Sequence, residues 1–401
     1  MNKTIKIVLI IYLFQGIIHN LGHPVTPELV KGLDIPDYMF GVFFAMMSLG
    51  LTIGGPIWGV LGDRGNKRLY MSLGLVIYSI GQFMFAYVDN TAWMVFFRFL
   101  SGFGVSASVT LLISHIIEHS TTENRAKHLA WNAAGFTLGA SLGYLIGGFI
   151  AENSFFIKYL HTDDLRVVFL IQALLNIVHA AVVYILIVDN GKEVEANRTT
   201  ILDGFRNIRR MNKTLIVFMF SLTLITIGTI NISKFLDVYF RDLNYSKSML
   251  GTFVFVTGLV SLFTSAVIVP LVIKVKKDMM IILAIQLLSA VIVFIVFRSA
   301  EVLITLYTLF MVYVIIKAVY TVLEQNYISS FGKEGQYGAI MGVRQAFLAI
   351  GMVIGPIVGG FLYDIKPRFV FDFSVLMFIF GFVLLLVVRN RIKQDVNIES
   401  L

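Results

Sequence analysis

The sequence predicts an all-α integral membrane protein with twelve transmembrane helices in two six-helix bundles. Three observations lead to this prediction. Hydrophobic residues make up 57% of the 401 residues and charged residues only 14%, so the chain has more apolar surface than a water-soluble fold can bury. Twelve apolar stretches are long enough to cross a bilayer. A glycine pattern in the first half of the chain recurs in the second half.

Each predicted span is a window of about 20 or more mostly apolar residues, the length that the hydrocarbon core requires. The start of the chain has Lys3 and Lys6 followed by an apolar run and resembles a secretory signal, but no small-residue cleavage site follows, so we interpret it as the first helix. The predicted windows are residues 5–24, 38–61, 69–88, 91–117, 128–151, 166–189, 214–240, 248–273, 279–297, 302–328, 336–363 and 370–388.

The longest hydrophilic stretch divides the chain into two halves. We predict an N-terminal bundle at 1–189, a cytoplasmic linker at 190–213 and a C-terminal bundle at 214–401. With both termini in the cytoplasm, most of the 32 lysines and arginines fall on cytoplasmic segments, as the positive-inside rule requires. We therefore expect a monomeric, multi-pass protein of the bacterial inner membrane.

Composition also excludes several kinds of chemistry. The chain has no cysteine, and it lacks a phosphate-binding loop, a His-Glu-x-x-His pair and a Gly-x-Ser-x-Gly elbow, so we expect no enzyme activity, no cofactor and no metal site. The net charge of +8 is scattered between apolar runs, so we expect no nucleic-acid partner. We place His115, Glu118 and His119 in the solvated margin of the fourth span.

Glycines at four-residue spacing form the internal repeat. Such spacing lets two transmembrane helices approach closely, so we interpret these positions as packing residues. A close, smooth contact also permits sliding, so a hinge role is the alternative. Halves repeated in this way place a substrate path between them, near the middle of the bilayer. The glycines are Gly139, Gly143, Gly147 and Gly148 in the fifth span, and Gly351, Gly355, Gly359 and Gly360 in the eleventh, where Pro356 is a further hinge candidate.

A charged turn joins the second and third spans, and it is either a topology marker or a functional loop. It reads Gly59-Val60-Leu61-Gly62-Asp63-Arg64-Gly65-Asn66-Lys67-Arg68. This turn resembles the signature cytoplasmic loop of the major facilitator superfamily. The resemblance implies a latch of the outward-open state, made by Asp63, Arg64, Lys67 and Arg68. Asn66 departs from the usual glycine, but asparagine tolerates the left-handed conformation.

Three further segments resemble the drug:proton antiporters of the same superfamily. They are His23-Pro24-Val25-Thr26-Pro27 in the first span, Arg98 to Gly104 in the fourth, and Gly139 to Gly148 in the fifth, where Tyr144 replaces the usual proline. The resemblance covers essentially the whole chain. It implies a twelve-helix transporter, a small substrate, and a proton or other ion gradient as the driving force in place of a cofactor.

Ionisable residues inside the spans are the candidate transport residues, because a charge at the bilayer centre costs about 2.5 to 3.5 kcal/mol and requires a partner or a wet cavity. Arg98 lies too deep to reach the headgroups easily. Lys317 and Glu324 are two turns apart on one helix face. Arg344 lies near the cytoplasmic end of its span, where a transport role and contact with headgroups are both open.

Four more residues complete the candidate set. Lys234 and Asp237 are three residues apart, so a local ion pair is the alternative to a role in substrate or proton coupling. His19 and His23 carry imidazoles, which titrate in the range useful to a proton-coupled carrier, and hydrogen-bonded packing is the alternative for them.

The leading hypothesis is a proton-coupled exporter of amphipathic compounds, in which residues 1–189 rock against 214–401 and Glu324 or a first-span histidine exchanges the proton. Basic residues outnumber acidic residues in the spans, which favours anionic or zwitterionic substrates. One alternative is therefore a carrier of anionic metabolites or a flippase of anionic lipids. Another is a membrane receptor that transports nothing.

Overall fold

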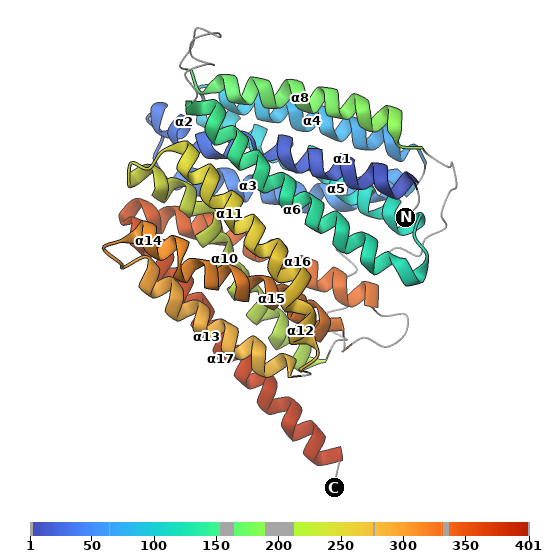
Figure 1. The fold of residues 1–401 in the computed structure, drawn as a ribbon, viewed down its shortest axis with the longest axis vertical. Helices are drawn as coiled ribbons and strands as arrows, with labels where there is room; N and C mark the ends of the chain where they lie inside the picture. The colour runs from blue at the N-terminus through green and yellow to red at the C-terminus, as the bar shows by residue number, and fades with distance from the viewer. Residues whose placement is uncertain are drawn as a thin grey trace. The chain divides into compact units, whose positions relative to one another are not determined.

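The structure is a computed structural model that describes residues 3–63, 65–152, 164–188, 212–275, 277–329, 331 and 337–399. The described residues form helices joined by short turns (Figure 1). Twelve helical stretches of the described chain are long and apolar enough to cross a membrane. The predicted all-α class and its twelve spans are therefore confirmed. Most of the predicted linker, residues 190–211, lies outside the described residues.

The helices follow the predicted windows closely. Those of the first half are α1 (Lys3–Asn20), η1 (His23–Val25), α2 (Thr26–Gly32), α3 (Tyr38–Asp63), α4 (Lys67–Tyr87), α5 (Thr91–Glu118), α6 (Thr122–Glu152) and α8 (Arg166–Leu186). Those of the second half are α10 (Lys213–Asp242), α11 (Lys247–Phe263), η3 (Thr264–Ile268), α12 (Val269–Ile273), α13 (Asp278–Val296), α14 (Val302–Tyr307), α15 (Leu309–Ser329), α16 (Tyr337–Ile365) and α17 (Pro367–Glu399).

Proline accounts for two breaks in the spans. In the first span α1 ends at Asn20 and a short 3-10 turn carries Pro24, which has no N–H to continue the α-helical bonding. The Thr26 hydroxyl donates to the Gly22 carbonyl over 2.7 Å and satisfies a backbone acceptor at this break. In the eighth span the π-helical segment η3 lies directly before Pro270 in α12, where a wider turn accommodates the missing donor.

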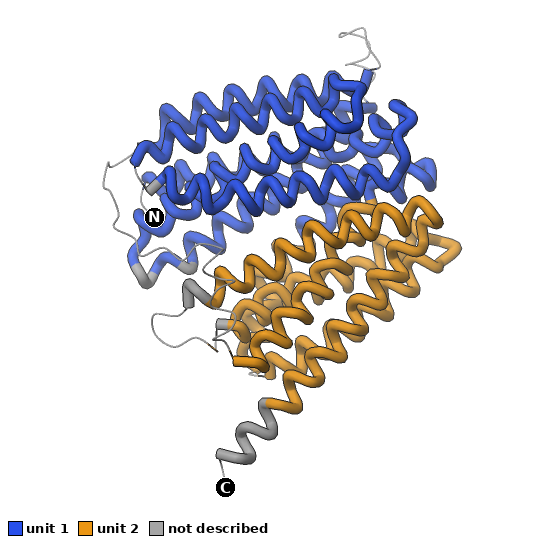
Figure 2. The backbone as a smooth tube through the Cα atoms, turned by 180° about the vertical axis from the view of Figure 1, so that it is seen from behind, with its two compact units in different colours: residues 1–196, 237–259 blue, residues 197–236, 260–401 orange. Residues whose placement is uncertain are grey.

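The chain divides into two compact units (Figure 2). Unit 1 contains residues 1–196 and 237–259, and unit 2 contains residues 197–236 and 260–401. The end of α10 and most of α11 therefore group with the N-terminal helices. The division at 189 and 214 that the sequence suggests stays a prediction.

A polar layer lies between two apolar clusters in unit 1. One cluster includes Ile5 and Leu112, and the other includes Val25 and Phe169. On each of α1, α4, α5 and α8, one or more buried residues with polar side chains fall in sequence between the two clusters. The polar layer thus occupies the middle of four membrane spans. Its members are Gln15, His19, Tyr78, Gln82, Arg98, Gln172 and Asn176.

The repeated glycines bring pairs of helices into close backbone contact within each unit. In unit 1, a Cβ at Gly139 of α6 would overlap the carbonyl oxygen of Leu13 in α1. In unit 2, a Cβ at Gly351 of α16 would crowd Thr226 in α10. The same relation holds for Gly143 against α1, for Gly147 against Leu21 just after α1, and for Gly355 and Gly359 against α10. The two halves thus repeat one packing pattern, as small residues at this spacing permit.

Candidate functional site

Arg98 is a buried cation held by neutral groups. Its side chain comes from α5, the residue is 3% exposed, and Nη1 donates to Oε1 of Gln82 over 3.1 Å. The guanidinium carbon lies 3.6 Å from the centroid of the Phe85 ring, a cation–π distance. Among the described residues, no carboxylate forms an ion pair with Arg98. The polar layer therefore carries an uncompensated positive charge in the described part of the chain.

Hydrogen bonds connect Arg98 to the first helix. Gln82 Nε2 donates to the Tyr78 hydroxyl over 2.9 Å, and that hydroxyl donates to the His19 carbonyl over 3.2 Å. Gln172 Nε2 donates to the same carbonyl and to the Ile18 carbonyl, each over 2.9 Å. The structure thus brings together two residues that the sequence singled out, Arg98 and His19, through side chains of α4 and α8.

The polar layer also contains unsatisfied polar atoms. His19 Nε2 lies 3.1 Å from Oδ1 of Asn176, but three buried atoms of the layer have no hydrogen-bond partner in the described part of the chain. They are Gln15 Oε1, Arg98 Nε and Gln172 Oε1, and Nε2 of the buried His179 on α8 likewise has none there. Because buried polar groups are normally satisfied, such a group of atoms is a place where a polar ligand can bond.

Glu324 and Arg344 form a two-pronged ion pair in unit 2. Arg344 Nε donates to one carboxylate oxygen over 2.7 Å and Nη2 to the other over 2.6 Å. The Glu324 side chain is 2% exposed and that of Arg344 is 12% exposed. This fork geometry is the strongest common arrangement of the two groups, and it joins α15 to α16. The ion pair gives Arg344 a partner inside the protein, and its transport role stays a prediction.

Lys317 and Lys234 concentrate positive charge elsewhere in unit 2. Lys317 lies on α15 and Lys234 on α10, and their charges repel one another. Within the described residues, Lys317 has no carboxylate in ion-pair distance. Lys317 and Glu324 therefore have different surroundings although they share one helix.

Tyr144 of α6 holds the buried carboxylate of Asp237. The Tyr144 hydroxyl donates to Asp237 Oδ2 over 2.9 Å, and Asp237 is only 2% exposed. The His23 ring stacks between Tyr144 and Phe44, at centroid distances of 5.3 and 5.6 Å. Tyr144 stands where the resembling antiporters have proline, and its hydroxyl gives the position a polar function that proline lacks. Sequence analysis listed His23 and Asp237 separately, and unit 1 brings them together.

Charged residues surround the ends of α10 and α11 in the same unit. Arg241 Nη2 lies 2.9 Å from Oδ2 of Asp37, and Lys247 Nζ lies 2.5 Å from Oε2 of Glu28. Glu152 at the end of α6 accepts hydrogen bonds from the backbone N–H of Lys247 and from the Ser248 hydroxyl. Sequence analysis missed these residues, although each charge stands at the predicted outer end of a span.

The charged turn after α3 adopts the conformation that its sequence requires. Gly65 has a φ of 102° and Asn66 a φ of 60°, so asparagine does take the left-handed conformation. Lys67 forms an ion pair with Glu118, and the Arg68 guanidinium lies 5.0 Å from the centroid of the Tyr184 ring. Arg64 and the side chain of Asp63 lie outside the described residues. The latch role of this turn stays a prediction.

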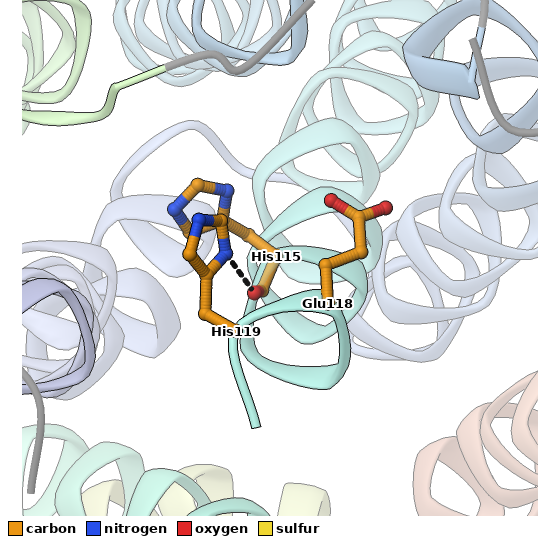
Figure 3. Close-up of side chains that lie close together, drawn as sticks. All are labelled: His115, Glu118 and His119. Atoms are coloured by element: carbon orange, nitrogen blue, oxygen red, sulfur yellow. Dashed lines mark hydrogen bonds between the residues drawn. The ribbon is translucent and has the colours of Figure 1, made fainter. Parts of the chain in front are cut away.

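His115, Glu118 and His119 form a cluster at the end of α5 (Figure 3). One potential ligand atom of each side chain lies within 4.8 Å of the others. The prediction of a solvated margin is wrong for His115, which is 2% exposed. His115 is one of the buried residues of α5, together with Leu112 and Ile116.

Comparison with known proteins gives one family over nearly the whole chain. A sequence model of the Major Facilitator Superfamily matches residues 8–239 and 214–400. The quinolone resistance protein NorA of Staphylococcus aureus (strain MSSA476) is 26% identical over 404 residues, which cover 98% of each protein. Multidrug resistance protein 1 of Bacillus subtilis (strain 168) is 25% identical over 400 residues, which cover 96% of this chain and 95% of that protein.

Solved structures give the same fold. A bacterial homologue of the human lysosomal transporter Spinster has a TM-score of 0.78 at 13% identity, with 96% of both chains covered. A D-xylose-proton symporter has a TM-score of 0.69 at 15% identity, again with 96% of both chains covered. At these identities the likeness establishes the fold and says nothing about the substrate.

Proposed function

Because this chain belongs to the major facilitator superfamily of membrane transporters, we propose that it exports small amphipathic compounds in exchange for protons. The protein is a transporter and not an enzyme. Support for export comes from the full-length similarity to two bacterial proteins whose names record resistance to quinolones and to multiple drugs. Support for proton coupling comes from the candidate site.

The observation that carries proton coupling is the burial of Asp237 against Tyr144. An ionised carboxylate costs free energy when it leaves water, and a protonated one costs much less. The proton on Asp237 therefore changes the free energy of closing α6 against the end of α10. His23, stacked on Tyr144, is a second titratable group beside this contact.

The cycle follows from this free-energy difference. When the contact between α6 and α10 opens to the outside, Asp237 meets water and takes up a proton. Protonated Asp237 can then be buried as the outer end closes, and the proton leaves to the cytoplasm before substrate binds. One proton thus moves inward for each substrate moved outward, while residues 1–189 rock against 214–401.

We assign Glu324 a different role from Asp237. Both of its carboxylate oxygens are bonded to Arg344, so the pair is a fixed connection between α15 and α16. In the proposed cycle Asp237, and not Glu324, exchanges the proton. His23 is the first-span histidine that lies beside the exchange site.

A second candidate function is transport of anionic metabolites or anionic lipids. It is favoured by Arg98 and Lys317, two cations that have no ion-pair partner among the described residues. A cation in a low-dielectric site gains several kcal/mol from a counter-charge, so an anionic substrate group would bind there well.

Transport by the full-length protein in liposomes tests both candidates. An imposed pH gradient should drive accumulation of a fluorescent amphipathic compound, and dissipation of the gradient with an ionophore should stop it. Uptake of anionic, zwitterionic and cationic probes of matched size then shows which substrate charge the protein prefers. Accumulation that ignores the pH gradient would refute proton coupling. Movement of anionic probes alone would favour the second candidate.

A further inference from the structure

The cluster at the end of α5 has the composition of a metal site. His115, Glu118 and His119 form the sequence His-x-x-Glu-His, in which two imidazoles four residues apart share one face of a helix. Two histidines and a carboxylate are a common ligand set for zinc in proteins. The reverse order, His-Glu-x-x-His, does not occur in the sequence.

A hydrogen bond orients His119 for coordination. Its Nδ1 lies 2.9 Å from the carbonyl oxygen of His115, which can only accept, so Nδ1 carries the proton (Figure 3). The neutral ring then has its lone pair on Nε2. Histidine ligands of metals commonly donate the other ring N–H to a backbone carbonyl in this way, which fixes the tautomer and the ring orientation.

The three side chains lie close enough to meet one ion after rotation about their side-chain bonds. The rings of His115 and His119 lie against each other, with centroids 4.1 Å apart, and the Glu118 carboxylate extends from the neighbouring side of α5 (Figure 3). One potential ligand atom of each side chain lies within 4.8 Å of the others, whereas ligand atoms at about 2.0–2.1 Å from tetrahedral zinc lie about 3.3 Å apart. The proposed site therefore requires the side chains to rotate when the metal binds. The carboxyl end of α5 also favours a cation through its helix dipole.

We propose that these three residues bind a divalent transition-metal cation such as Zn²⁺, and that the metal competes with Lys67 for Glu118. Lys67 belongs to the charged turn, is the first residue of α4 and pairs with Glu118. A bound cation takes over the carboxylate and releases the ammonium. Metal occupancy is therefore coupled to the turn that joins α3 and α4.

Metal titration of the full-length protein in detergent, purified without a histidine tag and stripped with a chelator, tests this proposal. Zn²⁺ affinity is measured by competition with a fluorescent zinc indicator, and Co²⁺ is added separately to record the visible absorption that reports its ligands. We expect one saturable site, with His119→Ala and Glu118→Gln each weakening Zn²⁺ binding at least tenfold. His128→Ala, a histidine at the same end of the bundle, is the control and should leave the affinity unchanged.

Lys67→Met should change the Zn²⁺ affinity in the opposite direction. Removing the competing ammonium should tighten Zn²⁺ binding severalfold and leave the Co²⁺ spectrum unchanged. His115→Ala removes a buried side chain, so the folding of this variant is checked by size-exclusion chromatography. His119 is only half-buried, so His119→Ala should disturb packing less. The proposal is overturned if no saturable site exists or if His119→Ala binds Zn²⁺ as the wild type does. The proposed competition between Zn²⁺ and Lys67 for Glu118 is refuted if Lys67→Met binds Zn²⁺ no more tightly than the wild type.

Discussion

Two arginines in the spans of this chain, the buried Arg98 and the partly buried Arg344, have opposite surroundings. Arg344 is matched by the carboxylate of Glu324, whereas Arg98 is held by an amide and an aromatic ring. Removing one member of a buried ion pair leaves an uncompensated charge in a low-dielectric interior. Removing a lone cation relieves that cost. The same kind of substitution should therefore affect stability in different ways at the two positions.

Glu324→Gln should destabilise the protein by about 3 to 5 kcal/mol, because Arg344 then lacks its partner. The double variant Glu324→Gln/Arg344→Met should recover much of that loss, because it removes both charges. Thermal unfolding in detergent measures the effect, with Glu301→Gln in an exposed turn as control. Equal losses in the single and double variants would contradict a stabilising pair.

Arg98→Gln should reduce transport at least about tenfold, equivalent to about 1.4 kcal/mol, while the melting temperature changes little. Arg98→Lys keeps the charge but loses the guanidinium group whose Nη1 donates to Gln82, so its activity should be intermediate. Transport rates in liposomes give the measurement. A structural role alone would instead lower the melting temperature and the transport rate together.

At the scale of helices, the transmembrane spans could be predicted from the sequence, but the side-chain contacts between helices could not. Hydropathy predicts a transmembrane helix because lipid accepts only apolar, internally bonded segments, so all twelve windows reappear in the structure. Pairing of Glu324 with Arg344 depends on the register of α15 against α16, which no local pattern reveals. The same limit explains why the contact of Tyr144 with Asp237 was missed.

Glycine substitutions test the packing of α6 against α1. Gly139→Ala places a methyl group against the Leu13 carbonyl oxygen, so we expect loss of folded protein and of transport. Gly342→Ala is the matched control in α16, because nothing lies within 4 Å of its added Cβ. That control should be neutral or slightly stabilising, since alanine favours a helix over glycine. Similar behaviour of the two variants, measured by fluorescence-detected size exclusion, would contradict close packing at Gly139.

For the molecule as a whole, the charged contacts around α10 and α11 should control opening of the predicted outer end. The chain has no cysteine, so Ser141→Cys introduces a single thiol. Ser141 is 4% exposed and faces Gly258 of α11. Adding Arg241→Ala removes the contact with Asp37 and should raise the rate of maleimide labelling at least about threefold. Adding Arg298→Ala, which removes an ion pair with Asp372 in unit 2, is the control and should leave the rate unchanged.

Whether Asp237 carries the coupled proton is measured most directly in liposomes that contain Asp237→Asn. Asparagine keeps a hydrogen-bonding group for Tyr144 but cannot exchange a proton. We expect this variant to retain substrate counterflow, which needs no net proton movement, and to lose accumulation driven by a pH gradient. Asp89→Asn, at an exposed carboxylate, should retain both activities. Gradient-driven accumulation at the wild-type level in Asp237→Asn would contradict the proposed exchange of protons at this residue.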